Sequence, residues 1–156
     1  MKEIFINKAR SVAFTGHRIL YSDYNYMSLL ETLKNLVLDG YDTFLVGMAL
    51  GFDTECFKAL EEIRKENHIK IIACVPCLTQ ADRFSLKQKR EYNRMLNSAD
   101  ETVLISEKYT EKCMQKRNEF MVDNASVLVS YLRREFGGTK NTVKYAEKVN
   151  CKIIKI

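Results

Sequence analysis

The stretch IKIIACVP, residues 69–76, gives a clear indication of the fold class of this chain. It is apolar almost throughout, with one lysine near its start, and it ends at the only proline of the sequence. Strands that are apolar on both sides are typical of parallel sheets covered on both faces, whereas half-exposed strands alternate apolar and polar residues. The stretch therefore predicts a parallel-sheet strand that is buried on both sides.

The segments around this strand alternate between strand and helix patterns. Further strands are predicted at 11–15, 41–47, 101–105, 126–132 and 151–156, and helices at 27–38, around 56–63, 84–97, 109–123 and 139–149. Strands separated by helix-length segments imply right-handed βαβ crossovers. The predicted fold class is α/β: one Rossmann-like domain over residues 1–156, with a mostly parallel sheet and helices on both faces.

Composition limits the classes of function. With 156 residues, 46% of them apolar, the chain can bury a core of its own. No apolar run approaches the roughly 20 residues that a membrane-spanning helix needs, and no signal-peptide pattern is present, so we expect a cytoplasmic protein without a membrane partner. The net charge of +5 is spread along the chain and only weakly indicates anionic partners.

The five cysteines do not indicate disulfide, redox or metal chemistry. Their odd number fits reduced thiols. Cys74 and Cys77 have the C-x-x-C spacing, but Cys74 falls inside a predicted strand, whereas redox pairs place the first thiol at a helix N-terminus. No other His or Cys spacing matches a zinc site. We therefore expect no metal and no required cofactor.

The fold directs attention to loops that follow strands, because ligands of open α/β sheets bind beyond the carboxyl ends of the strands. The first such loop holds Thr15, Gly16, His17 and Arg18. Gly16 permits a tight turn, and His17 and Arg18 offer cationic donors suited to phosphate or carboxylate. The alternative is a simple turn with two solvated side chains.

A second loop contains two glycines and a carboxylate after the second strand. Its candidate residues are Gly47, Met48, Ala49, Gly51 and Asp53. Amide N–H groups of such a loop can surround an anion, and the carboxylate is better suited to ribose hydroxyls than to phosphate. Asp53 is alternatively the N-cap of the next helix.

The third candidate is the pair Arg117 and Asn118 on a helix. Met114, Arg117 and Met121 share one face at i, i+3 and i+4 spacing, which predicts a guanidinium that extends from an apolar wall toward a ligand. The alternative is an amphipathic helix with a solvated arginine head.

The fourth candidate is a glycine pair with a hydroxyl, Gly137, Gly138 and Thr139, before the last helix. Amides at a helix N-terminus bind anions, although Thr139 is also a plain N-cap candidate.

Four motifs in this order, TGHR, GMALGFD, RNEFMVD and GGTKNTVKYA, resemble the DUF1273 family of YpsA/YoqJ-like proteins. That family belongs to the SLOG superfamily of Rossmann-like domains, with the DprA/Smf and LOG proteins, and the resemblance runs from about Val12 to the C-terminus. It implies a pocket formed by the four loops that binds a nucleotide or nucleotide-derived ligand, such as a nucleoside phosphate, NAD or an ADP-ribose-like molecule. Unlike many family members the chain has no Trp, so Tyr, Phe or Arg would have to stack on a base.

The resemblance to the LOG enzymes leaves catalysis open. Those enzymes cleave the N-glycosidic bond of nucleotides with an Arg and a Glu, and Arg117 matches the Arg. In their glycine loop, however, Lys140, Asn141 and Lys144 stand where Gly, Thr and the Glu are expected. A lysine opposes the oxocarbenium character that this cleavage develops. We therefore expect a ligand-binding protein, with a nucleotide N-glycosidase that uses Arg117 as the alternative.

A second alternative is single-stranded nucleic-acid binding, as in DprA relatives. Its candidate footprint is Lys87, Lys89, Arg90 and Arg94, which are equally explained as a solvated helix face. The expected partner is thus a small nucleotide-type molecule and not nucleic acid. The family resemblance also allows a homodimer.

Overall fold

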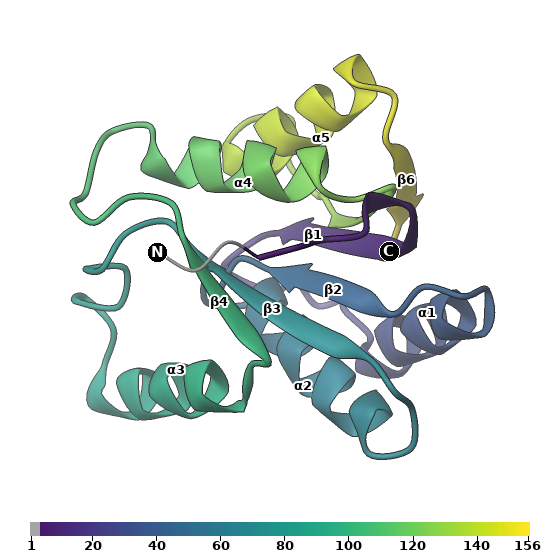
Figure 1. The fold of residues 1–156 in the computed structure, drawn as a ribbon. Coiled ribbons are helices and arrows are strands. Elements are labelled where there is room, and N and C mark those ends of the chain that lie inside the picture. The colour runs from purple at the N-terminus through teal and green to yellow at the C-terminus, as the bar shows by residue number, and fades with distance from the viewer. Residues whose placement is uncertain (1–3) are drawn as a thin grey trace.

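The computed structural model describes residues 4–156, which form a six-stranded parallel sheet covered on both faces by helices (Figure 1). The strands are β1 (Ser11–Gly16), β2 (Thr43–Val46), β3 (Lys70–Val75), β4 (Glu101–Leu104), β5 (Val127–Tyr131) and β6 (Lys152–Lys155). The helices are a short 3-10 turn (Lys8–Arg10), α1 (Tyr26–Leu38), α2 (Phe52–Arg64), α3 (Leu86–Ser98), α4 (Cys113–Asp123) and α5 (Gly138–Lys148). The predicted α/β class and Rossmann-like architecture are confirmed.

The strand order in the sheet is β4-β3-β2-β1-β5-β6, so the side on which the chain adds new strands changes once. From β1 to β4 each new strand is added on the same side, which places α1, α2 and α3 on one face of the sheet (Figure 1). The chain then returns through α4 to add β5 on the other side of β1, so α4 and α5 cover the opposite face. The loops after β1 and β5 therefore lie at a topological switch point, where α/β sheets bind ligands.

Burial on both faces of the sheet explains why the run 69–76, which contains the third strand, is apolar. In β3, Ile71 and Ala73 pack with α1, α2 and α3, whereas Ile72 and Cys74 pack with α4 and α5. All four side chains are fully buried. Because both faces are covered, alternation of polarity is absent, as the sequence predicts.

The helix starts of α1, α3 and α5 differ from the predicted positions by one or two residues, and those of α2 and α4 differ by more. Cys113 begins α4, later than the predicted residue 109, and the residues just before it form a turn in which the amide of Cys113 donates to the carbonyl of Thr110 at 3.2 Å. Phe52 begins α2, earlier than expected, directly after Gly51. The later start of α4 lengthens the loop after β4, and the earlier start of α2 shortens the loop after β2.

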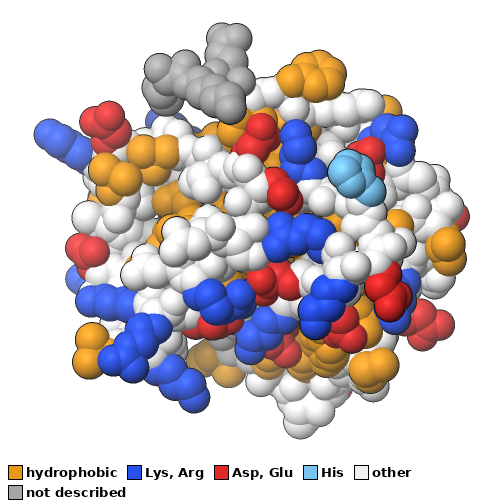
Figure 2. All heavy atoms as spheres, turned by 60° about the horizontal axis from the view of Figure 1, so that its bottom comes forward, with side chains coloured by type: hydrophobic (Ala, Val, Ile, Leu, Met, Phe, Trp, Pro, Cys, Tyr) orange, Lys and Arg blue, Asp and Glu red, His pale blue; other side chains and the backbone are white. Residues whose placement is uncertain are grey.

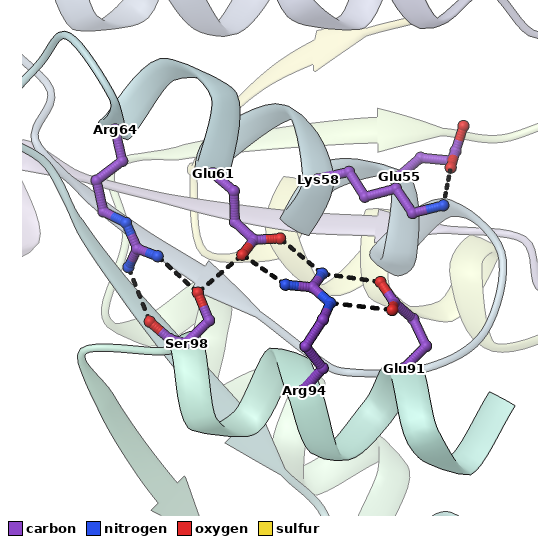
Figure 3. Close-up of polar contacts among 7 residues, drawn as sticks. All are labelled: Glu55, Lys58, Glu61, Arg64, Glu91, Arg94 and Ser98. Carbon is purple, nitrogen blue, oxygen red and sulfur yellow. Dashed lines mark hydrogen bonds and ion pairs between the residues drawn. The ribbon is translucent and has the colours of Figure 1, made fainter. Parts of the chain in front are cut away.

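Helix α3 is held on α2 by an ion-pair network (Figure 3). The guanidinium of Arg94 donates to both oxygens of Glu61 at 2.8 and 2.9 Å and to both oxygens of Glu91 at 2.8 and 3.0 Å. The hydroxyl of Ser98 extends the network to Arg64. Bidentate geometry makes this a stronger contact than an ordinary surface pair.

The surface of this side of the molecule carries both signs of charge. Figure 2, turned so that the helices below the sheet in Figure 1 come forward, shows basic and acidic side chains interspersed across one band.

No helix within residues 4–156 is both long and apolar enough to cross a membrane.

Candidate ligand-binding site

A hollow of about 490 Å³ lies at the switch point, and all four predicted loops contribute to its wall. The predicted residues that line it are Thr15, Gly16, His17, Arg18, Ala49, Asp53, Arg117, Asn118, Gly138 and Thr139. These residues come from β1, the loop after β2, α2, α4 and the N-terminus of α5. The structure thus brings together segments that are up to about 120 positions apart in the sequence.

Four predicted residues, Gly47, Met48, Gly51 and Gly137, do not line the hollow. Met48 is buried, with its side chain in the core and a backbone φ of 64°. Gly137 has a φ of 100° and is the N-cap of α5, so the predicted N-cap role of Thr139 is wrong.

Gly51 joins the first two loops. Its φ is 80°, and a Cβ placed there would lie 2.2 Å from the carbonyl oxygen of Arg18. The next amide, that of Phe52, donates to the carbonyl of His17 at 3.1 Å. Gly51 is also the N-cap of α2, so Asp53 is not the cap. Only glycine permits this close approach of one loop to the other.

Gly16 is required for packing. A Cβ at this position would lie 2.3 Å from Cδ2 of Phe52, a fully buried ring that stacks on Tyr131 with centroids 5.5 Å apart. The sequence predicts a tight turn at Gly16, whereas the structure places this residue at the end of β1 and without a positive φ. Gly16 therefore allows α2 to pack closely against the first strand.

Arg117 and Asp53 place two buried, opposite charges in the wall of the hollow. Only 5% of Arg117 and 7% of Asp53 is exposed. A Cβ at Gly47 would lie 3.0 Å from both the Arg117 Cζ and the Asp53 Oδ2, so both side chains pack against this glycine without a direct hydrogen bond or ion pair to each other. Arg117 donates to the Gly47 carbonyl and, at 2.7 Å, to Oδ1 of Asn118, while Oδ2 of Asp53 accepts the amide N–H of Ala49 at 3.1 Å.

Burial dominates the protonation equilibria of this pair. Desolvation raises the pKa of Asp53 and lowers that of Arg117, and the attraction between the two charges opposes both shifts. The arginine stays protonated because its ordinary pKa is far above neutrality. The guanidinium predicted to extend toward a ligand is thus bonded to a backbone carbonyl and to the Asn118 side chain within the protein.

His17 is neutral and not the cationic donor that the sequence predicts. Its ring is buried, and Nε2 accepts the backbone N–H of Arg133 at 2.8 Å. Desolvation, followed by the positive charges of Arg134 and Arg133, lowers the pKa of His17 below its usual value. Tyr21 and Tyr131 surround the ring edge to face. His17 therefore orients the loop after β5 and contributes no positive charge at pH 7.

The structure adds Arg134, Tyr21 and Ile19 to the wall of the hollow. Arg134 is exposed, and its Nη2 lies 3.4 Å from Nδ1 of His17. The signal for Arg134 was present in the sequence, because two arginines follow the fifth strand directly, at its carboxyl end. No such signal marks Tyr21 and Ile19, since their position depends on the path of the loop.

The cysteines take the state that the sequence predicts. All five are free thiols. Cys74 lies inside β3, where burial raises its pKa to about 12, and Cys77 is buried with its Sγ 3.6 Å from the hydroxyl oxygen of Thr79. Within residues 4–156, no group of three His, Cys, Asp or Glu side chains is arranged to hold a metal ion.

Comparison with solved structures shows related folds. DNA processing protein A (DprA) from Streptococcus pneumoniae superposes with a TM-score of 0.71 and 18% identity over 95% of this chain, which spans 50% of that protein. DprA from Helicobacter pylori superposes with a TM-score of 0.68 and 17% identity over 93% of this chain, which spans 64% of that protein. At these identities the likeness is one of fold.

Sequence comparison establishes the family. The chain is 34% identical over 134 residues to the uncharacterized SPbeta prophage-derived protein YoqJ of Bacillus subtilis (strain 168). The aligned region covers 77% of this chain and 78% of the relative. A family model described as the YspA SLOG family matches residues 23–155. The resemblance found in the four loop motifs is confirmed, and the chain belongs to the YspA SLOG family.

Proposed function

We propose that the hollow at the switch point binds a nucleotide or nucleotide-derived ligand, such as a nucleoside phosphate, NAD or an ADP-ribose-like molecule. One observation carries this proposal: the four loops converge on a single hollow whose charged lining is mostly positive. Arg18 and Arg134 are exposed at this hollow, and the one carboxylate in its wall, Asp53, faces the guanidinium of Arg117. An anionic ligand fits such a lining.

The N-terminus of α5 is the expected place for a phosphate. Gly138 and Thr139 line the hollow there, and no side chain among the described residues caps this helix end. The first amides of a helix have no partner within the helix and carry partial positive charge. Thr15 adds a hydroxyl, and Asp53 has its second oxygen for a ribose hydroxyl.

Binding without turnover is the form of this function that we propose. N-glycosidic cleavage needs a carboxylate near the ribose that stabilises positive charge. Lys144, at the position where the LOG enzymes have their Glu, is an exposed lysine on α5, and Asp53 is already close to a guanidinium. Incubation with AMP, NAD and ADP-ribose followed by chromatography should return the compounds unchanged; release of a free base would establish the N-glycosidase instead.

Isothermal titration calorimetry against AMP, NAD and ADP-ribose tests the proposal. Substitution of Arg18 or Arg134 by Ala should weaken binding about tenfold or more, because hydrogen bonds to charged groups contribute about 1.5–3 kcal/mol. Arg90→Ala, an exposed arginine of α3 outside the hollow, is the matched control and should leave affinity unchanged. Absence of binding to every compound, or equal losses for Arg18→Ala and Arg90→Ala, would contradict the proposal.

Single-stranded nucleic acid is the second candidate ligand, which the sequence-based expectation disfavoured. It is supported by the fold similarity to H. pylori DprA, a protein with a described single-stranded DNA binding mode. The footprint predicted on α3 is reduced, because Arg94 is held by two glutamates and acidic side chains are interspersed on this side of the molecule (Figure 2). Lys87 and Arg90 remain exposed. If this candidate is correct, Lys87→Ala/Arg90→Ala should weaken oligonucleotide binding and reduce its salt dependence.

A further inference from the structure

A second hollow, of about 550 Å³, adjoins the first along the same edge of the sheet. It lies beyond the carboxyl ends of β2, β3 and β4, and it shares Arg18, Ala49 and Met114 with the first hollow. The loops that follow β3 and β4 form its outer wall and contact each other, since the amide of Leu78 donates to the carbonyl of Glu107 at 3.4 Å (Figure 1). None of the four predicted loops accounts for this outer wall.

The lining of the second hollow fits an aromatic base. Tyr109 presents a ring that is 62% exposed, and Phe84 presents a half-buried ring. Thr79 and Asp82 supply polar groups that can bond the edge of a heterocycle, and Arg83 can stack on it. Bases stack on such side chains regardless of their identity, because every base has a π-face.

Each of the two hollows includes one exposed tyrosine, and Arg18 belongs to both hollows. The first contains the exposed ring of Tyr21 and the second that of Tyr109. Arg18 lines both hollows and is itself exposed. A guanidinium between two aromatic surfaces is suited to the phosphates that join two nucleosides.

A shared hydrogen-bond network fixes the wall between the hollows. The carbonyl oxygen of Gly47 accepts from Arg117, which lines the first hollow, and at 3.0 Å from Nε2 of Gln80, which lines the second. The hydroxyl of Tyr92 in turn donates to Oε1 of Gln80 at 2.9 Å. One carbonyl therefore bonds a residue of each hollow, and side chains held in place before binding lower the cost of ordering them around a two-part ligand.

We propose that the two hollows form one binding site for a dinucleotide-type ligand, two nucleosides joined through phosphate, with Arg18 against the linking phosphates and Tyr21 and Tyr109 against the two bases. This inference rests on the proposed function and names its ligand class. Each hollow is large enough for a small ligand, since such pockets measure about 300–1,000 Å³. A mononucleotide would therefore leave half of the site empty.

The test compares whole ligands with their halves by titration calorimetry. The probes are NAD and 5′-phosphorylated dinucleotides of each base, and for each of them the corresponding mononucleotides. The best dinucleotide should bind at least tenfold more tightly than either half. Tyr109→Ala should weaken that dinucleotide about 5- to 150-fold, the range for loss of one base–aromatic stack, and change mononucleotide affinity less than twofold. Leu78→Ala, an equally exposed residue of the adjoining loop that lines neither hollow, is the control.

Each other outcome overturns the inference in a distinguishable way. Mononucleotides that bind as tightly as dinucleotides, with Tyr109→Ala silent, would leave the first hollow as the site and refute the second. Affinity that keeps rising from dinucleotide to octanucleotide would identify a nucleic-acid strand as the ligand instead. Failure of every probe to bind would refute the proposed function together with this inference. Thermal unfolding of Tyr109→Ala should match that of the wild type, because the ring is mostly exposed.

Discussion

Removal of the buried positive charge in the wall of the hollow should destabilise the protein strongly. In Arg117→Met the carboxylate of Asp53, 7% exposed, loses the guanidinium beside it. Loss of one partner of a direct buried ion pair costs about 3–5 kcal/mol because the other charge stays buried, and we expect the lower end of this range because Arg117 and Asp53 attract each other without a direct contact. The lost donor to the Gly47 carbonyl adds little, since Nε2 of Gln80 still bonds that oxygen at 3.0 Å. For a domain of this size the change corresponds to a fall in Tm of roughly 10 °C.

A double-mutant cycle measured by urea denaturation checks the cause. Asp53→Asn keeps an oxygen for the amide of Ala49 but removes the charge. If the two charges stabilise each other, the double variant Arg117→Met/Asp53→Asn should be more stable than Arg117→Met alone, with a coupling free energy of at least about 1 kcal/mol. Additivity within about 0.5 kcal/mol would refute this reasoning and show that the Gly47 carbonyl alone holds Arg117.

The pH dependence of Arg117→Met supplies an independent check. Burial already raises the pKa of Asp53, and loss of Arg117 should raise it further. Protonation then neutralises the buried carboxyl in the folded state, so the stability lost in Arg117→Met should partly return as the pH falls toward 5. A loss that stays constant between pH 8 and pH 5 would mean that Asp53 is not the group left unpaired.

Three further predictions concern glycine, histidine and the α2–α3 contact. Gly51→Ala should be much more destabilising than Gly40→Ala in thermal denaturation, because both have positive φ but only Gly51 would place a Cβ against backbone, whereas nothing lies within 4 Å at Gly40. Because the pKa of His17 is lowered in the folded state, the unfolded state binds more protons, and wild-type stability should fall as the pH drops through about 6.5 and below. His17→Gln should make stability depend less on pH in urea titrations at pH 5 to 8. Arg94→Met should cost about 1 kcal/mol, less at 1 M salt, because the Arg94 side chain is 47% exposed. Arg90→Met on the same helix should cost nothing measurable by the same denaturation assay.

The class and order of the elements could be predicted from the amino-acid sequence. The apolar run at 69–76 identified a strand covered on both faces, and the places where such runs end located the loops that face the ligand. These features are local: a period of two or 3.6 residues, a glycine after a strand, and a hydroxyl before a helix. These features predicted that Arg18 and Gly138 lie at the same edge of the sheet, because the carboxyl ends of parallel strands lie together, and the structure places both residues in one hollow.

The contacts and charge states of the individual side chains follow from the three-dimensional arrangement of the elements. Arg117 finds its carbonyl acceptor 70 residues away, and His17 is made neutral by burial and by arginines more than 110 residues along the chain. The need for glycine at position 16 comes from the ring of Phe52, and the second hollow with Tyr109 exists because the loops after β3 and β4 meet. Desolvation, charge pairing and close packing depend on neighbours that the strand order brings together, and no local pattern of residues encodes them.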